Sequence, residues 1–303
     1  MLMTASLAAA AVQFACPACS LPLQQSSHGL VCDRGHTVNV AKQGHVHMLP
    51  PRRVDALELA ASDKKVRAAR AFFEAGGYSA QIDAVAVETT RALAQCVEPA
   101  AERHLLNVGC GEGQILRRVQ QRLEAEQECV GGLWGLDASK LATRYAATRQ
   151  RGHARFATCQ PHRLPFADGS FSVVLATFAS CPWEEACRVL RPGGAVIVVR
   201  AGPRHHFDEA CGDTCGRGGR ALSADADLRR QHARRPKQHP AGLAEMYVRA
   251  LTLETYCGEL NELLLAMEGQ GVGVEGQADS RTTTVDWLIS THRVWLGTGV
   301  EDS

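Results

Sequence analysis

The chain has 303 residues, of which 45% are hydrophobic and 21% are charged, and its formal net charge is +1. This length allows one large domain with a small satellite, and the composition is that of an ordinary globular protein. A net charge so close to zero excludes nucleic-acid binding through overall charge, so such a role needs local patches. No run approaches the roughly 20 apolar residues of a membrane span, so we expect no membrane association.

The first residues and the cysteines bear on the compartment. Residues 1–13 are apolar and rich in small residues, without a basic region, and we interpret them as a disordered leader rather than a secretory signal. Most of the 12 cysteines are scattered along the chain, which is typical of a reducing compartment. We therefore expect a cytoplasmic protein, with an organelle such as the chloroplast as the alternative.

A short pattern of cysteines and histidines follows. Cys16 and Cys19 form a C-x-x-C pair, and Cys32 and His36 follow with C-x3-H spacing. Three thiolates and one imidazole are a ligand set of closed tetrahedral zinc sites. We predict one structural zinc ion in a module spanning residues 14–55. Free thiols are the alternative, and His28 competes with His36 as the fourth ligand.

Hydrophobic periodicity predicts the elements that come next. Residues 55–98 show helical spacing, interrupted at Gly76 and Gly77, with Val97 still in the second helix. From residue 104, buried strands alternate with amphipathic helices. Strands are expected over 105–108, 133–136, 154–159, 171–178 and 195–201, and helices over 114–124, after a cap at Ser139, and over 183–190. This alternation predicts a doubly wound parallel sheet covered on both faces.

The C-terminal third has a weaker pattern. Residues 208–242 are rich in glycine, arginine, aspartate and proline, and we interpret them as a flexible insertion. A helix is expected over 251–267, followed by two closing strands over 282–289 and 293–296. We assign all of residues 56–303 to one α/β domain that includes the insertion.

The loop after the first buried strand carries three glycines. Gly109 would allow a tight turn, Gly111 would let the backbone approach a ligand, and Gly113 would let the helix pack closely on the strand. Asp137 ends the next strand, where a carboxylate can accept hydrogen bonds from both ribose hydroxyls of a nucleoside. The G-x-G-x-G spacing suits a nucleoside without a pyrophosphate, which favours S-adenosylmethionine. A turn that merely needs glycines is the alternative.

Other motifs carry a resemblance to a known family. Leu-Pro-Phe-Ala-Asp-Gly-Ser-Phe at 164–171 and Arg-Val-Leu-Arg-Pro-Gly-Gly at 188–194 are similar to class I methyltransferases. The chain resembles, from Phe14 to about Phe207, the bacterial 23S ribosomal RNA guanine-N1 methyltransferases. The stretches that carry this resemblance are Cys16 to Cys19, Cys32 to His36, 41–50 (Ala-Lys-Gln-Gly-His-Val-His-Met-Leu-Pro), 70–78 (Arg-Ala-Phe-Phe-Glu-Ala-Gly-Gly-Tyr), 107–113, 162–166 and Gly-Pro-Arg-His at 202–205.

The resemblance implies a Rossmann-like class I fold with an N-terminal zinc module, and methyl transfer from S-adenosylmethionine to guanine N1 in a ribosomal RNA hairpin. By matching position, Tyr78, Gly111, Glu112 and His205 would contact the cofactor, beside the Gly109, Gly113 and Asp137 indicated by the glycine loop. Three departures concern this assignment. Asn107 stands where the family has aspartate, the arginine-rich stretch 216–237 has no counterpart, and 266–270 lacks the family's Thr-Pro and aromatic residues.

Local charge agrees with an RNA substrate. Between Cys16 and Arg70 there are eight basic residues and four acidic residues, a surplus that suits phosphate contacts. The basic residues are Arg34, Lys42, Arg52, Arg53, Lys64, Lys65, Arg67 and Arg70. No catalytic base for the guanine N1 proton is singled out, and His162 and Asp168 are the candidates. A quinone or sterol-type small-molecule methyltransferase and a non-catalytic RNA-binding relative are the alternatives, and homodimer formation is left open.

Overall fold

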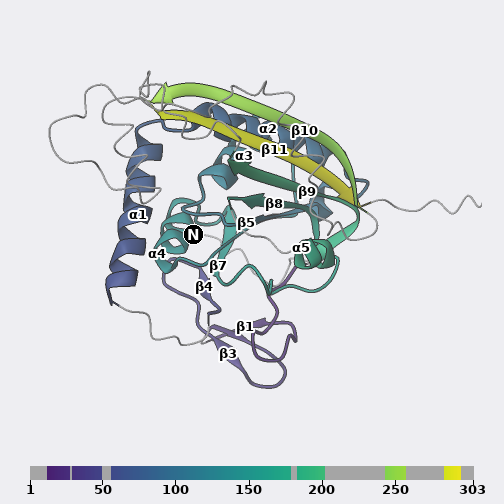
Figure 1. Ribbon diagram of the computed structural model, residues 1–303. Helices are drawn as coiled ribbons and strands as arrows, with labels where there is room; N and C mark the ends of the chain where they lie inside the picture. The colour runs from purple at the N-terminus through teal and green to yellow at the C-terminus, as the bar shows by residue number, and fades with distance from the viewer. Residues whose placement is uncertain are drawn as a thin grey trace, which may run out of the picture.

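The computed structural model describes residues 12–27, 29–49, 56–178, 183–201, 243–256 and 283–294. These residues form a small three-stranded sheet, a large eight-stranded sheet and five α-helices (Figure 1). The small sheet contains β1 (Gln24–Ser26), β2 (Gly29–Val31) and β3 (Thr37–Val38). The large sheet contains β4 (Val46–His47), β5 (His104–Val108), β6 (Gly132–Asp137), β7 (Ala154–Thr158), β8 (Phe171–Thr177), β9 (Leu190–Ala201), β10 (Leu243–Tyr256) and β11 (Thr283–Val294). The helices are α1 (Ala56–Glu74), α2 (Ser79–Ala94), α3 (Gln114–Ala125), α4 (Lys140–Arg149) and α5 (Trp183–Val189).

The strand order of the large sheet is β10-β11-β9-β8-β5-β6-β7-β4. Strands β4 to β9 all run parallel to one another, whereas β11 is antiparallel to both β9 and β10. Numbered along the chain without β4, the order from the β7 edge is 3-2-1-4-5-7-6, with the seventh strand reversed. The predicted doubly wound sheet and its class I methyltransferase arrangement are therefore confirmed.

Helices α1 and α2 are separated where the sequence predicts, at a pair of glycines. Gly76 has a φ of 90°, and a Cβ on Gly77 would lie 2.3 Å from the Phe72 ring. A side chain at either position would therefore strain the turn or displace the ring. The predicted cap of α4 is also present, because Ser139 Oγ accepts from Ala142 N at 3.2 Å. Val97 was expected in the second helix but lies beyond α2, and its side chain is 83% exposed.

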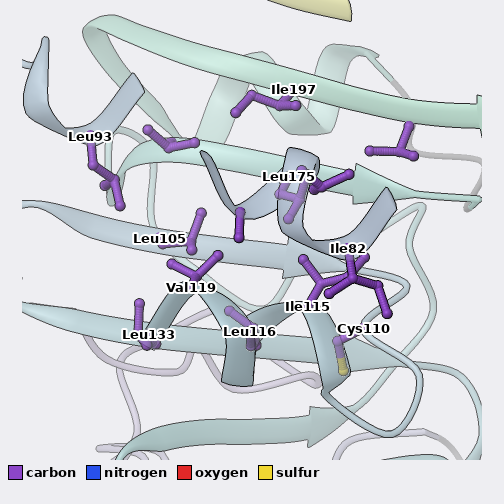
Figure 2. Close-up of a cluster of buried hydrophobic side chains, with 14 of the residues drawn as sticks. Ile82, Leu93, Leu105, Cys110, Ile115, Leu116, Val119, Leu133, Leu175 and Ile197 are labelled. Carbon is purple, nitrogen blue, oxygen red and sulfur yellow. The ribbon is translucent and has the colours of Figure 1, made fainter. Parts of the chain in front are cut away.

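One hydrophobic core lies between the large sheet and helices α2, α3 and α4. Leu105 of β5 and Leu175 of β8 point into this core from the sheet (Figure 2). Leu116 and Val119 of α3 pack against them and are fully buried. Because α3 buries residues at i, i+1 and i+4 spacing, its amphipathic pattern is the physical reason that it covers this face.

The N-terminal module covers the other face of the sheet. Phe14 contacts Trp134 of β6 edge-on at 5.0 Å and stacks on Phe166 at 5.3 Å. The connection from β7 to β8, residues 159–170, contains no helix, so the module lies where a crossover helix would otherwise pack. Strand β4 also extends the large sheet, because Val46 and His47 pair with β7. Figure 1 shows β4 between β7 and the small sheet.

The C-terminal part corrects two expectations. The helix expected over 251–267 is wrong in its first part, because residues 243–256 form strand β10, and residues 257–282 lie outside those described. Pairing with β11 along almost the whole length of β10 overrides the local helical spacing. The two expected closing strands are a single strand, β11, whose central Ser290, Thr291 and His292 are buried and pair with β9. The proposed insertion 208–242 lies outside the described residues.

Candidate functional site: a zinc cluster and a cofactor cavity

The four predicted zinc ligands come together in the N-terminal module. One ligand atom from each of Cys16, Cys19, Cys32 and His36 lies within 4.8 Å of all the others. Cys32 Sγ is 3.6 Å from Cys19 Sγ and 3.4 Å from His36 Nδ1. Tetrahedral zinc, with Zn–S near 2.3 Å and Zn–N near 2.0 Å, separates its ligand atoms by about 3.4–3.8 Å. The side chains therefore fit a zinc ion.

The surroundings of Cys32 also favour a metal-binding thiolate. Burial opposes ionisation, but the backbone amides of Arg34 and His36 and the side chains of Cys19 and His36 lower the pKa of Cys32 to about 6. The thiolate is the form of cysteine that binds metals. His28, the competing fourth ligand, lies outside the described residues.

The glycine loop from β5 to α3 is fixed from two sides. Gly109 N donates to Leu136 O at 2.8 Å, which ties the loop to the end of β6. Gly113 has a φ of 86°, and a Cβ there would lie 2.4 Å from Gln150 Nε2, so only glycine fits. Beside Gly111, by contrast, no atom lies within 4 Å of the position that a Cβ would occupy. The loop therefore leaves open space next to Gly111, as close approach of a ligand requires.

Asp137 links this loop to α4. Its Oδ2 accepts from Gly111 N at 2.9 Å, and its Oδ1 accepts from Ser139 N at 2.8 Å. Burial raises the pKa of Asp137, although the backbone amides of Ser139, Gly111 and Ala138 act in the opposite direction. An ionised carboxylate has about four acceptor positions, so Asp137 retains capacity for ribose hydroxyls.

A cavity of about 320 Å³ lies at the carboxyl ends of the central parallel strands, and we call it the cofactor cavity. Its lining consists of Val108, Gly109, Leu136, Asp137, Ala138, Cys159, Gln160, Pro161, Thr177 and Phe178. This edge is where doubly wound sheets bind their ligands. Asp137 offers a carboxylate to a ribose, and the apolar side chains of the lining offer walls to a base. This combination fits S-adenosylmethionine.

Thr177 and Asn107 support the floor of the cofactor cavity. Thr177 Oγ1 donates to Gly109 O at 2.8 Å and lies 3.2 Å from Asn107 Oδ1. Asn107 is completely buried, and its Nδ2 has no hydrogen-bond partner among the described residues. Asn107 thus lies beside Thr177 of β8 but brings no negative charge to the cavity, unlike an aspartate.

The remaining predicted cofactor residues are placed less directly. The Gly111 amide is bonded to Asp137, and neither Gly111 nor Glu112 lines the cofactor cavity. The Glu112 side chain is buried and its Oε1 accepts from Arg149 Nη1 at 3.1 Å. Tyr78 is 3% exposed, packs edge-on against Phe72, and is not part of the cavity lining. His205 lies outside the described residues, so its role stays a prediction.

A larger cavity of about 1130 Å³ lies between the N-terminal module and the segment that connects β7 to β8. We call it the ribbon cavity. It is lined from one side by Cys16, Ser20, Asn39, His47 and neighbouring residues, and from the other by Cys159, Gln160, His162, Asp168 and Arg188, among others. Cys159 and Gln160 belong to the lining of both cavities, so the two cavities are neighbours that share a wall at the end of β7.

The two candidates for a catalytic base differ in their surroundings. Arg188 Nη1 donates to Asp168 Oδ1 at 2.9 Å and to Phe166 O at 2.7 Å, and Arg188 also forms an ion pair with Glu185. Asp168 therefore helps to hold the 164–168 segment in place. His162 is exposed and lines the ribbon cavity, and its side chain forms no ion pair or hydrogen bond with another described residue.

Phe178 is a site residue that the sequence reasoning missed. It follows β8 directly, lines the cofactor cavity, and is 52% exposed. Its φ of 48° is uncommon for a residue with a side chain, and its amide donates to Val199 O at 2.9 Å. Strained backbone at a cavity rim is often functional. Its position directly after a buried strand at the ligand-binding edge is the sequence signal that could have identified it.

Comparison with protein families follows the same division of the chain. Residues 106–198 match the family model described as "Methyltransferase domain", and residues 14–53 match that described as "RlmA, N-terminal", a zinc ribbon. The chain thus combines a segment similar to the RlmA zinc ribbon with a segment similar to a methyltransferase domain. The zinc ribbon contains all four clustered ligands, and the methyltransferase domain contains the glycine loop and Asp137. Zinc and S-adenosylmethionine are therefore the cofactors that these two parts take.

Two curated relatives confirm the resemblance to ribosomal RNA methyltransferases. A 23S rRNA (guanine(748)-N(1))-methyltransferase of Streptomyces fradiae is 37% identical over 187 residues, which are 61% of this chain and 61% of that protein. A relative from Micromonospora griseorubida is 35% identical over 203 residues, 63% of this chain and 66% of its own length. The chain thus spans somewhat less than two thirds of the relatives that it matches.

Likeness to solved structures is weak. The [4+2]-cyclase SpnF is 20% identical with a TM-score of 0.40, and the match covers 70% of this chain and 82% of that chain. At this score the likeness carries no argument about activity. Within the described part of the chain, no helix combines the length and the apolar character needed to cross a membrane.

Proposed function

We propose that the protein transfers a methyl group from S-adenosylmethionine to N1 of a guanine in a hairpin of large-subunit ribosomal RNA. The observation that carries this proposal is the wall that the two cavities share at Cys159 and Gln160. The cofactor cavity of the methyltransferase domain therefore lies next to a space whose opposite wall is the zinc ribbon. A small-molecule enzyme has no need of such a wall, and two relatives at 35–37% identity support the RNA substrate.

S-adenosylmethionine supplies a methyl group activated by a positively charged sulfur. The chain's own residues bind and orient the reactants. Asp137 and the glycine loop hold the nucleoside end, and Thr177 fixes the loop by its hydrogen bond to Gly109. Alignment of donor and acceptor supplies much of the rate in such transfers.

Groups that line the two neighbouring cavities hold the guanine. Phe178 presents an exposed ring at the cofactor cavity, and aromatic rings stack on splayed RNA bases. Guanine N1 loses its proton as the N–C bond forms, so a base must accept that proton. His162 is available in the ribbon cavity, whereas Asp168 is held by Arg188. We therefore propose that His162 accepts the proton from guanine N1.

The decisive experiment is transfer of labelled methyl groups to unmodified 23S-type ribosomal RNA, followed by nucleoside analysis. We expect 1-methylguanosine as the product. Labelling of a different nucleoside would move the target while keeping an RNA substrate. Transfer to a quinone or sterol acceptor with none to RNA would overturn the proposal, and so would failure of the zinc-loaded chain to methylate any acceptor.

A further inference from the structure

Several stretches of the chain contain no acidic residue, and two of them concern the surface beside the cavities. Residues 138–167 lie between Asp137 and Asp168 and include six lysines and arginines. Residues 34–49, in the zinc ribbon, also lack acids and include Arg34 and Lys42. These two stretches create strongly positive regions on an otherwise balanced molecule.

The fold places these two stretches side by side. The zinc ribbon contributes β4, which pairs in parallel with β7 through Val46 and Ala157. Arg151 Nη2 donates to Lys42 O at 3.3 Å, a direct contact between the end of α4 and the ribbon. Figure 1 shows α4, β7 and β4 next to one another. Lys42 of the ribbon therefore lies beside the end of α4.

Helix α4 presents its cations to solvent along one face. Lys140 and Arg144 are exposed at i and i+4, and Arg151 is exposed just past the last turn. The opposite face, with Leu141 and Ala146, is buried in the protein. We call the exposed set Lys42, Lys140, Arg144 and Arg151 the α4 edge. None of these four residues forms an ion pair with another residue that the structure describes.

This charge arrangement is unfavourable in the protein alone. Like charges at i and i+4 repel, and Lys140 lies in the first turn of α4, where the helix dipole disfavours a cation. Burial lowers the pKa of His45, and the nearby charge of Arg144 lowers it further. An anionic partner would relieve the repulsion between these cations and the unfavourable position of Lys140 at the start of α4.

Acidic residues near the α4 edge are already engaged. Arg149 points inward and pairs with Glu112 and Glu74, at 3.1 Å in each case. Glu74 also accepts from Arg70, which lies 4.7 Å over the ring of Tyr145. These pairs balance one another next to α4 and leave the exposed cations without a counter-charge.

We propose that the α4 edge is a docking surface for the phosphate backbone of the substrate RNA. The inference rests on the proposed function and extends it to a specific surface. Lys140 follows Ala138, which lines the cofactor cavity, and His47 of β4 lines the ribbon cavity. The edge therefore runs from the rim of both cavities along α4 to Arg151. A duplex or hairpin stem held there would carry its loop toward the cofactor.

The test replaces Lys140, Arg144 and Arg151 together by glutamine. Affinity for in vitro transcribed, unmodified 23S-type RNA is measured across a range of salt concentrations. Each phosphate contact contributes about 0.7–0.9 to the slope of log affinity against log salt, so the slope should fall by about 2–3. Cofactor affinity should stay that of the wild type, because none of the three residues lines the cofactor cavity. Thermal stability should change little, because relief of the like-charge repulsion offsets loss of the exposed hydrogen bond from Arg151 to Lys42 O.

A matched variant removes three cations elsewhere, at Arg117, Arg122 and Arg200, and has the same net charge. Its slope should change by less than about 1. The variant Lys140→Arg, Arg144→Lys, Arg151→Lys keeps the charges and should keep the slope. Equal loss in the α4 and matched variants, or no loss in either, overturns the proposal. If the wild type still forms 1-methylguanosine in that case, the proposed function stands and only the surface is wrong.

Discussion

Asp137 determines both the shape of the glycine loop and the charge of the cofactor cavity. Its two oxygens accept from Gly111 N and Ser139 N, so Asp137→Ala removes a ligand contact and leaves two amides without acceptors. We expect the affinity for S-adenosylmethionine to fall by about 1.5–3 kcal/mol, as for a hydrogen bond to a charged group. Isothermal calorimetry measures this loss. Asp168→Ala, which removes an exposed acid outside the cofactor cavity, should bind the cofactor normally.

The raised pKa of Asp137 gives a second prediction. Burial makes protonation begin at a higher pH than for an exposed aspartate, so cofactor affinity should fall early as the pH is lowered. Because the folded state then binds this proton more readily than the unfolded state, the group's contribution to the free energy of unfolding rises as the pH falls. Affinity and stability should thus change in opposite directions. A pH titration of both quantities, compared with Asp137→Ala, checks the sign; parallel changes would contradict it.

Phe178 lies at the rim of the cofactor cavity, where its ring can stack on an RNA base. Phe178→Ala should lower kcat/KM for RNA by an amount equivalent to about 1–3 kcal/mol, the usual effect of losing one stacked base, and should lower cofactor affinity much less. Phe178→Tyr keeps the ring and should retain most of the activity. Equal loss of RNA and cofactor affinity in the alanine variant would show that the ring supports the cofactor cavity instead.

At the scale of elements, the zinc ribbon is part of the core rather than an appendage. Phe14 packs on Trp134 and Phe166, and Ala15 N donates to Pro165 O at 2.7 Å. A closed zinc site contributes directly to folding free energy. Loss of zinc should therefore uncover one face of the large sheet as well as unfold the ribbon.

Cys19→Ser provides the test of this coupling. The variant should bind less than one zinc per chain by elemental analysis, and hydrogen exchange should accelerate at the β7 amides that pair with β4, including Thr158. Its melting temperature should fall for the whole chain. Cys129→Ser is the control, since Cys129 is exposed and far in sequence from the ligands. A zinc-free wild type with unchanged exchange in β7 would contradict the coupling.

The elements also show where sequence reasoning succeeds and fails. The glycine loop, Asp137 and the zinc ligands were predictable because each depends on residues that are close in sequence. The last part of strand β10, residues 251–256, was predicted as helix from its local spacing, which carries less weight than its pairing with β11. Strand β4 has only two residues, and its partner β7 lies far along the chain, so no local pattern announces it.

At the scale of the whole molecule, the site depends on where the parts meet. Motifs predicted a zinc module and a nucleoside site separately, but only the fold shows that the cofactor cavity and the ribbon cavity share a wall at Cys159 and Gln160. The α4 edge was missed for the same reason. Charge gathered from two distant segments is a property of the packed molecule and has no local sequence signature.

The pairing of β4 with β7 has a consequence for biosynthesis. Val46 leaves the ribosome long before Ala157, its partner in the sheet, because about 110 residues separate the two. At about 5–20 residues per second, the ribbon waits roughly 5–20 seconds with its apolar side, including Phe14, uncovered. During that interval the ribbon depends on its own small sheet and on the metal, because the surface that will cover it has not been made. We therefore expect early zinc capture to protect the nascent chain from aggregation, and zinc-starved cells should accumulate the protein in insoluble form.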